Sequence, residues 1–521
     1  MAKTYRIHPA IGIGRVGNSE KFYLAPELPE GTAIDIDISA QLEMPLKAYK
    51  DETGKIKKQA VRFRIWEHEE TDNGLTSIRE ITSNEATIEW RVRLGNKKAA
   101  HETVSPQNSG NRNQSISDQS KLELTSNFPP ISGASQSTSE INTPKFLGSK
   151  DVSLGLLKTD AMGRLIVIGG NGNSERVPGN ETDRLDYADN DLWFDDTSDG
   201  YVEATIKLNN EEELHELKPS WVIFSPPDYA PEIRAIFTLY DVAKGVAYDE
   251  YIVSIPDEIS FQRDVMPIFE RARTLGNVVP ESYKGTYDLI SNDMAKLSNN
   301  SDENSQFRQE SLNNLKLAFD TIERLEQALS DYFDDVLKLW VAGNFKDDFS
   351  IPTTAGTNIT PSGLDRAALD QTVGGGFFPG IEAGKWMSKR EEIYAFELVD
   401  GELSPRLNSE NLSVFYGGRT ISGPGYMTAG MALPWQADFL KCKGNSSFLW
   451  WPAQRPDSAL MDADNPQSRV PWIKDDVLTT HKALIETSHR LAFIREVTNL
   501  AGDKVFVEDE RDPTLPRNLV S

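Results

Sequence analysis

Ala60-Val-Arg-Phe-Arg-Ile-Trp66 places apolar side chains at every second position, with arginines between them. This period of two predicts a β-strand with one buried face and one wet face. Thr87-Ile-Glu-Trp-Arg-Val-Arg93 repeats the pattern, and Leu165-Ile-Val-Ile168 is a shorter apolar run. Gly, Pro, Asn and Asp residues bound these segments, as expected of turns. Residues 1–255 are therefore predicted to form a β-rich region with antiparallel sheets.

The remaining regions follow from changes in this pattern. Residues 101–145 are rich in Ser, Asn, Gln and Gly, which predicts a flexible surface loop. In residues 256–350 the apolar spacing becomes three and four, which predicts a helical region. The predicted helix face consists of Leu315, Phe319, Ile322, Leu325, Leu329, Phe333, Val336 and Trp340, and a stop signal follows at Ala342-Gly343-Asn344. Residues 351–521 form a Gly- and Pro-rich C-terminal region with a last helix at Asp475–Phe493, and the predicted fold class is α+β.

Composition narrows the classes of function. The 521 residues carry a formal net charge of −25, so nucleic acid is a poor partner for this surface. An acidic surface is compatible with steering of cationic amines, although plain solubility explains the charge more simply. No apolar run reaches the roughly 18 residues of a membrane span, and the N-terminus lacks the apolar core of a signal peptide. We therefore expect a cytoplasmic protein.

Three patterns resemble sites but are better explained as structure. Gly12-Ile-Gly-Arg-Val-Gly17 matches a dinucleotide fingerprint, yet the Pro-containing segment that follows is not a helix, so we interpret these glycines as turns. The acidic run Asp183–Asp199 lacks the spacing of an EF-hand and is interpreted as a turn with capped amides. The six histidines show no metal-binding spacing, so no metal site is predicted. His481 and His489 are two helical turns apart, and an ordinary hydrogen-bonded role is preferred to that of a ligand or base.

The only cysteine, Cys442, lies in the most unusual segment of the chain. Met431-Ala-Leu-Pro-Trp-Gln-Ala-Asp-Phe-Leu-Lys-Cys442 is followed by Trp450-Trp-Pro-Ala-Gln-Arg-Pro-Asp457. A lone cysteine is usually an inert, buried residue. Here a spacing of four on a helix would bring the Asp438 carboxylate beside the sulfur, where it could accept protons if burial raised its pKa. We therefore predict a functional site at these two residues.

These segments resemble the LodA-like quinoproteins, the L-lysine 6-oxidase and glycine oxidase family. The resemblance extends through most of the chain, from Tyr5–Ser19 to Asp264–Phe269 and Gly375–Gly384. It implies a cysteine tryptophylquinone cofactor made from the protein's own side chains. The family's cysteine falls on Cys442, and the aspartate needed to make the cofactor falls on Asp438.

The resemblance also implies a function and partners. It implies an amine or amino-acid oxidoreductase that deaminates a small primary amine or amino acid with oxygen, yielding a carbonyl product, ammonia and hydrogen peroxide. It further implies a flavoprotein maturation partner, and we expect a homo-oligomer. The family's quinone tryptophan, however, aligns with Ser488, and the only tryptophan after Trp450 and Trp451 is Trp472. Trp472 is therefore the predicted cofactor residue. The alternative is a relative that has lost the quinone and uses another cofactor or cross-link, or only binds or assembles other molecules.

Overall fold

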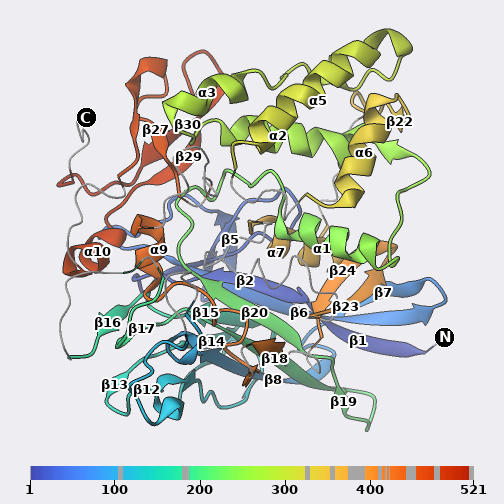
Figure 1. Ribbon diagram of the computed structural model, residues 1–521. Coiled ribbons are helices and arrows are strands. Elements are labelled where there is room, and N and C mark those ends of the chain that lie inside the picture. The colour runs from blue at the N-terminus through green and yellow to red at the C-terminus, as the bar shows by residue number, and fades with distance from the viewer. Residues whose placement is uncertain are drawn as a thin grey trace.

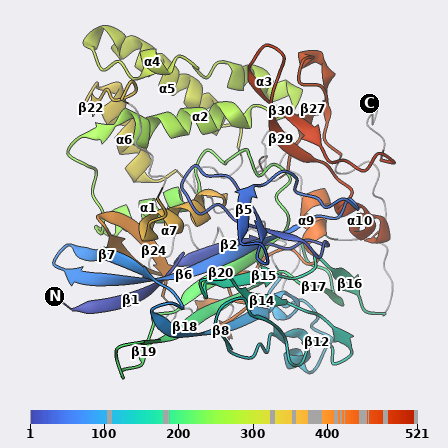
Figure 2. The same ribbon diagram turned by 180° about the vertical axis from the view of Figure 1, so that it is seen from behind.

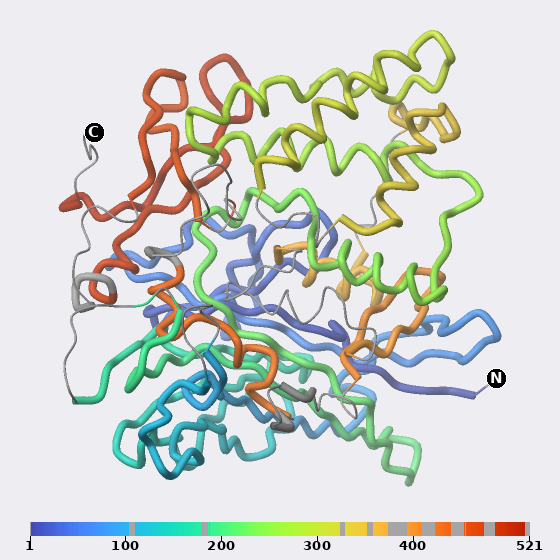
Figure 3. The backbone as a smooth tube through the Cα atoms, viewed as in Figure 1, coloured from blue at the N-terminus to red at the C-terminus, as the bar shows by residue number. Residues whose placement is uncertain are grey.

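The computed structural model describes residues 2–103, 110–178, 186, 188–322, 329–351, 358–373, 393–408, 414–416, 419–421, 423–441, 453, 455–473 and 481–515. Figure 3 follows the whole chain and draws the remaining residues in grey. Cys442 and the Trp450–Trp451 pair lie outside the described residues, as does Gly375–Gly384.

Helices cover one side of a large β-sheet assembly, so the α+β prediction is confirmed (Figure 1). The strands of this assembly include β1 (Lys3–His8), β2 (Ile11–Arg15), β3 (Phe22–Leu24), β4 (Ile34–Asp37), β5 (Leu42–Pro45), β6 (Lys58–Thr71), β7 (Gly74–Ile81), β8 (Ala86–Asn96), β14 (Gly155–Thr159), β15 (Leu165–Gly169), β18 (Ser198–Leu208), β20 (Ser220–Ser225), β23 (Tyr394–Val399) and β24 (Glu402–Leu407). The helices include α1 (Leu239–Asp249), α2 (Met266–Leu275), α3 (Glu281–Asp288), α4 (Met294–Leu297), α5 (Ser305–Phe319), α6 (Asp331–Val341), α7 (Pro361–Asp370), α9 (Trp435–Lys441) and α10 (His481–Ser488). A smaller sheet near the C-terminus has the strand order β28 (Arg469–Pro471), β27 (Ser458–Leu460), β30 (Lys504–Asp509), β29 (Phe493–Thr498).

Strand β6 contains the alternating segment 60–66 and is the centre of the assembly. It pairs antiparallel with β1, β7 and β15, and parallel with β3. The segment 87–93 lies in β8, which pairs antiparallel with β18 along most of its length. Burial alternates along β8, as its sequence predicts. The predicted antiparallel pairing is therefore confirmed for both segments.

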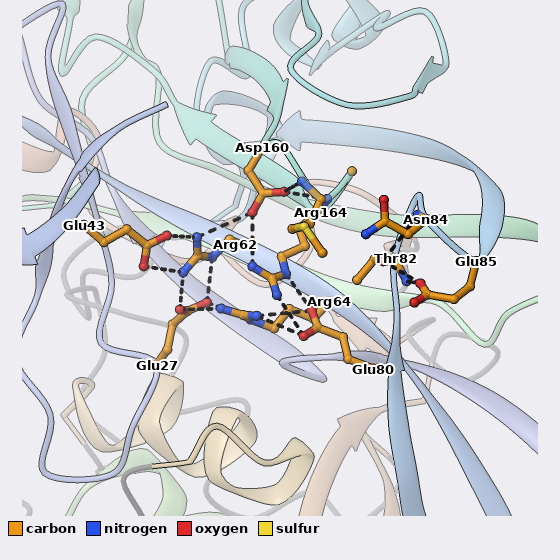
Figure 4. A network of polar contacts seen from close by, with 12 residues as sticks. Glu27, Glu43, Arg62, Arg64, Glu80, Thr82, Asn84, Glu85, Asp160 and Arg164 are labelled. Atoms are coloured by element: carbon orange, nitrogen blue, oxygen red, sulfur yellow. Dashed lines mark hydrogen bonds and ion pairs between the residues drawn. The ribbon is translucent and has the colours of Figure 1, made fainter. Parts of the chain in front are cut away.

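The prediction of a wet face is wrong for β6, because its arginines are buried as well. Arg62 and Arg64 lie on one face and share the carboxylate of Glu27 (Figure 4). Arg62 also binds Glu43, and Arg64 binds Glu80 at 3.1 Å. Burial alone would raise the pKa of Glu27, but the two guanidinium groups outweigh it and hold that pKa at about 2. The arginines of the alternating segment are therefore matched by buried ion pairs and not by exposure to solvent.

The Gly12–Gly17 pattern serves strand packing. Gly12 and Gly14 lie within β2, whose neighbour β20 runs parallel to it. A Cβ on Gly14 would lie 2.2 Å from the ring of Phe224, and one on Gly12 would lie 2.6 Å from the side chain of Val61. Strand β3 follows where a dinucleotide site needs a helix. These glycines therefore allow close approach of neighbouring chains inside the sheet, and do not form the predicted turns.

The helical layer begins at α1, with Thr238 as its cap, which is earlier than the predicted boundary at residue 256. The single predicted amphipathic helix is two helices, since α5 ends at Phe319 and α6 begins at Asp331. The predicted apolar face is nevertheless buried at Leu315, Phe319, Ile322, Phe333, Val336 and Trp340. The predicted stop is confirmed, because α6 ends at Val341 and Gly343 takes a φ of +80°.

Most residues in the described part of 101–145 are exposed, as predicted of a surface loop, but buried residues anchor the stretch to the fold. Arg112 and Asn113 are buried, as are Leu122 and Leu124. The Asn113 amide donates to the carbonyl of Ala99 at 2.8 Å and its oxygen accepts from the amide of Leu192 at 2.6 Å. Polar side chains thus anchor this stretch through backbone groups, which a count of apolar residues does not detect.

The last helix also ends earlier than predicted. Helix α10 stops at Ser488, and Phe493 begins strand β29 instead of ending the helix. A turn closes between them, where the amide of Arg490 donates to the carbonyl of Thr487 at 2.8 Å. The following residues 491–494 are buried in the core.

Two histidines and an aspartate form a buried chain between β1, β6 and α7. The Nδ1 atom of His8 lies 3.0 Å from the carboxylate of Asp365, and its Nε2 atom lies 3.3 Å from Nε2 of His68. Asp365 also accepts from the amide of Ala10 and the hydroxyl of Ser404, both at 2.6 Å. Both oxygens of the Asp365 carboxylate therefore have hydrogen-bond partners, and these contacts hold α7 against the N-terminal strands.

This arrangement predicts that the folded protein becomes less stable at acid pH. Burial, together with the neighbouring His8, lowers the pKa of His68 from 6.5 to about 4. The unfolded chain binds this proton near pH 6.5 and the folded chain only near pH 4. The free energy of unfolding therefore falls by up to roughly 3 kcal/mol from this group as pH drops through that window. His68→Gln should reduce the difference between denaturant unfolding free energies measured at pH 7 and pH 4.5.

Tyr287→Phe is the matched control, because it removes a buried hydroxyl, bonded to Thr321 at 2.9 Å, that stays protonated at both pH values. Its loss of stability should be equal at the two pH values. A pH dependence in His68→Gln identical to that of the wild type would contradict the assignment.

Candidate functional site

Asp438 lies in α9, directly after the segment Met431–Pro434. Its side chain is fully buried, as are those of Trp435 and Gln436. The backbone carbonyl of Asp438 accepts a hydrogen bond of 3.1 Å from the guanidinium of Arg455, which is also buried. The helix predicted from the spacing of Asp438 and Cys442 is therefore present at Asp438, whereas Cys442 follows outside the described residues.

Residues of the N-terminal half fix the beginning of α9. The amide of Trp435 donates to Oδ2 of Asp195 at 3.0 Å, which satisfies one of the free amides of the first turn. Oε1 of Gln436 accepts from the hydroxyl of Ser174 at 2.8 Å. Leu433 is held through both of its backbone groups, by the carbonyl of Ala188 and the side-chain amide of Asn190. Asp438 is thus carried on a helix that long-range polar contacts attach to a small two-stranded sheet, β16 (Ser174–Arg176) and β17 (Trp193–Asp195), and to the residues before β17.

The acidic run that includes Asp195 caps backbone amides, as interpreted from the sequence. Oδ2 of Asp196 accepts from the amides of Asn171 and Asn173, at 2.6 and 3.1 Å. Oδ1 of Asp199 accepts from the amide and hydroxyl of Thr428. Burial raises the pKa of Asp196 to about 7 and that of Asp199 to about 6, against the effect of these hydrogen bonds. Among the described residues, no cluster of His, Cys, Asp or Glu has the arrangement of a metal site.

Helix α10, which ends at Ser488, packs against α9, the helix that carries Asp438 (Figures 1 and 2). Ser488 is the last residue of α10 and is buried. Its hydroxyl donates to the carbonyl of Ile485 at 3.2 Å, and its own carbonyl accepts from the hydroxyl of Tyr229 at 2.6 Å. A serine has no ring that can be oxidised to a quinone, so a tryptophan-derived cofactor does not fit this position.

Trp472 also contacts Tyr229. The two ring centroids are 5.2 Å apart, and the indole N–H of Trp472 donates to the carbonyl of Ala492 at 3.1 Å. Trp472 is 2% exposed and belongs to the main apolar core. Burial raises the pKa of Tyr229, which therefore remains a hydrogen-bond donor. Tyr229 thus contacts both Trp472, the predicted cofactor residue, and the backbone of Ser488.

Two further predicted residues lie near this cluster. His489, next to Ser488, is half-buried, and burial lowers its pKa. His481 begins α10.

A small cavity of about 10 Å³ has Asp228, Arg234, Asp370 and Ala453 in its wall. Ala453 precedes Arg455 by two residues, so this cavity lies close to the part of the chain that contacts Asp438.

The sequence did not single out several residues that build this site. They are Lys98, Asn190, Asp195, Tyr229 and Arg455, and all are buried with polar contacts. Asp195 and Arg455 lie in the segments that carry the family resemblance, which was the one available signal. Lys98 and Tyr229 act through partners far away in the chain, so no local pattern identifies them.

Comparison with known proteins defines the family. The model "L-Lysine epsilon oxidase N-terminal" matches residues 8–224, and the model "L-lysine epsilon oxidase C-terminal domain" matches residues 327–462. Together the two models match more than half of the chain, which belongs to the LodA-like family.

Relatives agree with this assignment. The L-lysine 6-oxidase of Marinomonas mediterranea is 27% identical over 542 aligned residues, which cover 84% of this chain and 70% of the relative. The crystal structure of the L-Lys epsilon-oxidase from the same organism superposes with a TM-score of 0.74 at 21% identity, covering 98% of this chain and 95% of that one. The Schiff base intermediate of that oxidase with L-Lys gives a TM-score of 0.75 at the same identity and coverage. In the described part of this chain, no helix is both long and apolar enough to cross a membrane.

The packing around position 488 predicts the outcome of placing a tryptophan there. Ser488→Trp should lower the free energy of unfolding by about 1–3 kcal/mol or more, because an indole would have to enter a buried site whose backbone is held by Tyr229. Denaturant unfolding measures this loss. Ser301→Trp at an exposed serine is the control and should change stability by no more than about 0.5 kcal/mol. A Ser488→Trp protein as stable as the wild type would mean that the space for an indole has been kept.

Proposed function

We propose that this protein is an amine or amino-acid oxidase that deaminates a small primary amine or amino acid. In the overall reaction the substrate's CH–NH2 carbon is oxidised to a carbonyl, while oxygen is reduced to hydrogen peroxide and water releases ammonia. The buried carboxyl of Asp438, on the helix that leads to Cys442, is the observation that carries this proposal. Membership of the LodA-like family and the likeness to an L-lysine 6-oxidase support it.

Asp438 is proposed as the base that accepts a proton from the substrate carbon. A base for this step must be shielded from water and held in one orientation. Asp438 meets both requirements, since its side chain is buried and its helix is fixed at both the first amide and the Asp438 carbonyl. The same carboxylate is proposed to accept protons while Cys442 is cross-linked.

Trp472 is the proposed partner of Cys442 in a cysteine tryptophylquinone. Such a group would supply the electron sink that amino-acid side chains lack. Trp472 is supported by its place beside Tyr229, which also binds position 488. The proposed substrate, a small primary amine or amino acid, is supported by the likeness to an L-lysine 6-oxidase.

The second candidate function is that of a family member without the quinone, which works through another cofactor or cross-link, or as a binding or assembly protein. The buried Ser488 favours this alternative, because the sequence resemblance aligns it with the family's quinone tryptophan. The indole N–H of Trp472 is also engaged with Ala492, as in an ordinary core tryptophan. The covalent state of Cys442 separates the two candidates.

Peptide mass spectrometry of the native protein tests that state. For the oxidase we expect the peptide of Cys442 to be joined to the peptide of Trp472, with added oxygen, and the protein to absorb visible light and stain for quinone. The protein is best produced with a flavoprotein maturation partner, which we propose it requires. We also propose that it is a cytoplasmic homo-oligomer. A freely alkylatable Cys442 with unmodified tryptophans would exclude the quinone and leave the alternative.

Asp438→Asn tests the proposed base. The amide is nearly isosteric, so the fold should persist while turnover falls by roughly 10²–10⁴, measured as peroxide release. Asp348→Asn is a matched control, because Asp348 is also buried and accepts from Ser260 and Gln262 in the helical layer. Turnover of Asp438→Asn at the wild-type rate would show that the carboxylate is structural only.

A further inference from the structure

Lys98 and Asp195 form an ion pair in the interior, on the sheet side of α9. Both side chains are 0% exposed, and Nζ of Lys98 lies 2.5 Å from Oδ2 of Asp195. The ammonium also donates to the hydroxyl of Thr197 at 3.0 Å. Oδ1 of Asp195 accepts from the side-chain amide of Asn96 and from Thr197. Every charged atom of this pair is therefore hydrogen-bonded, as a buried pair requires.

A buried ion pair is a poor source of stability, since the cost of removing both charges from water can exceed their attraction. Burial lowers the pKa of Lys98, and the Asp195 carboxylate opposes that shift. An apolar pair of similar size would fill the same space without this cost. The pair therefore calls for an explanation other than general stability.

Asp195 provides such an explanation for the buried pair, because its Oδ2 atom binds two groups. It accepts from the ammonium of Lys98 and from the amide of Trp435, the first residue of α9, at 3.0 Å. Asp438 lies within the first turn of α9, which begins at Trp435. The carboxylate therefore fixes the start of the helix on which Asp438 is carried, and Lys98 holds that carboxylate in place.

The same residues hold the segment before α9. Arg112 donates to the carbonyls of Lys98 and Met431, both at 3.0 Å, and it pairs with Asp189 at 2.8 Å. The backbone of Lys98 and that of the 431–435 segment are thus joined through one buried guanidinium, as well as through Asp195. Two independent contacts connect Lys98 to the approach to Asp438.

We propose that Lys98 is a positioning residue for Asp438: it fixes the Asp195 carboxylate at the first amide of α9 and so determines where the Asp438 carboxyl is presented. The catalytic part of this inference rests on the proposed function, whereas the mechanical part does not. Lys98 itself is not proposed to contact substrate.

The experiment replaces Lys98 by methionine and by arginine in the full-length protein. Lys98→Met keeps the length of the side chain and removes its charge. Hydrogen exchange of the peptide spanning 429–441 is the first readout and needs no cofactor; we expect exchange there to be at least tenfold faster. Turnover is the second readout, and we expect kcat to fall about tenfold with KM changed less than twofold. Lys98→Arg, which restores a cation, should recover part of both.

Lys58→Met is the matched control, because Lys58 is also a buried lysine but its ammonium binds Asn171 at 2.7 Å. A uniform increase of exchange throughout Lys98→Met, equal to that in Lys58→Met, would overturn the proposal, as would unchanged exchange in 429–441. If Lys98→Met does not fold, the pair Lys98→Met with Asp195→Asn removes both charges together, and the same local increase in exchange is expected. Wild-type turnover in Asp438→Asn would refute the proposed base alone, because the exchange readout tests the hold on α9 separately.

Discussion

Strand β6 has hydrogen-bonded neighbours along both edges, and both of its faces are buried over most of its length. This burial obliges Arg62 and Arg64 to find carboxylates inside the protein, and Glu27 lies between them (Figure 4). The network connects β6 to the residues after β3, to β5 and to β7. The sheet is therefore held at its centre by charges that must all be matched, because an unmatched charge there would cost several kcal/mol.

The candidate site also depends on buried polar groups that have partners inside the protein. Asp438 is carried on a short helix of seven residues, which has little intrinsic stability. Its position comes from contacts with Asp195, Ser174, Asn190 and Arg455, which are remote in sequence. The position of the Asp438 carboxyl thus depends on buried polar contacts between its helix and residues elsewhere in the chain.

Tyr229 has a similar role between α10 and the C-terminal sheet. Its ring contacts Trp472 and Phe493, and its hydroxyl binds the backbone at Ser488. Position 488 and Trp472 are therefore neighbours of one tyrosine, although sixteen residues separate them in the chain. The effect of a substitution at position 488 therefore depends on Tyr229 and Trp472 as well as on the new side chain.

The sequence by itself determined the α+β class, the strands at 60–66 and 87–93, the buried face of α5 and α6, and the family. These follow from local periodicity, turn residues and recognisable segments, which do not depend on distant partners. Only the tertiary structure decided that Arg62 and Arg64 are buried, that Arg112 and Asn113 anchor the stretch predicted as a loop, and that Lys98 and Asp195 hold α9. The reason is physical: a polar side chain is buried when a partner satisfies its hydrogen bonds or charge, and these partners are brought together only by the fold.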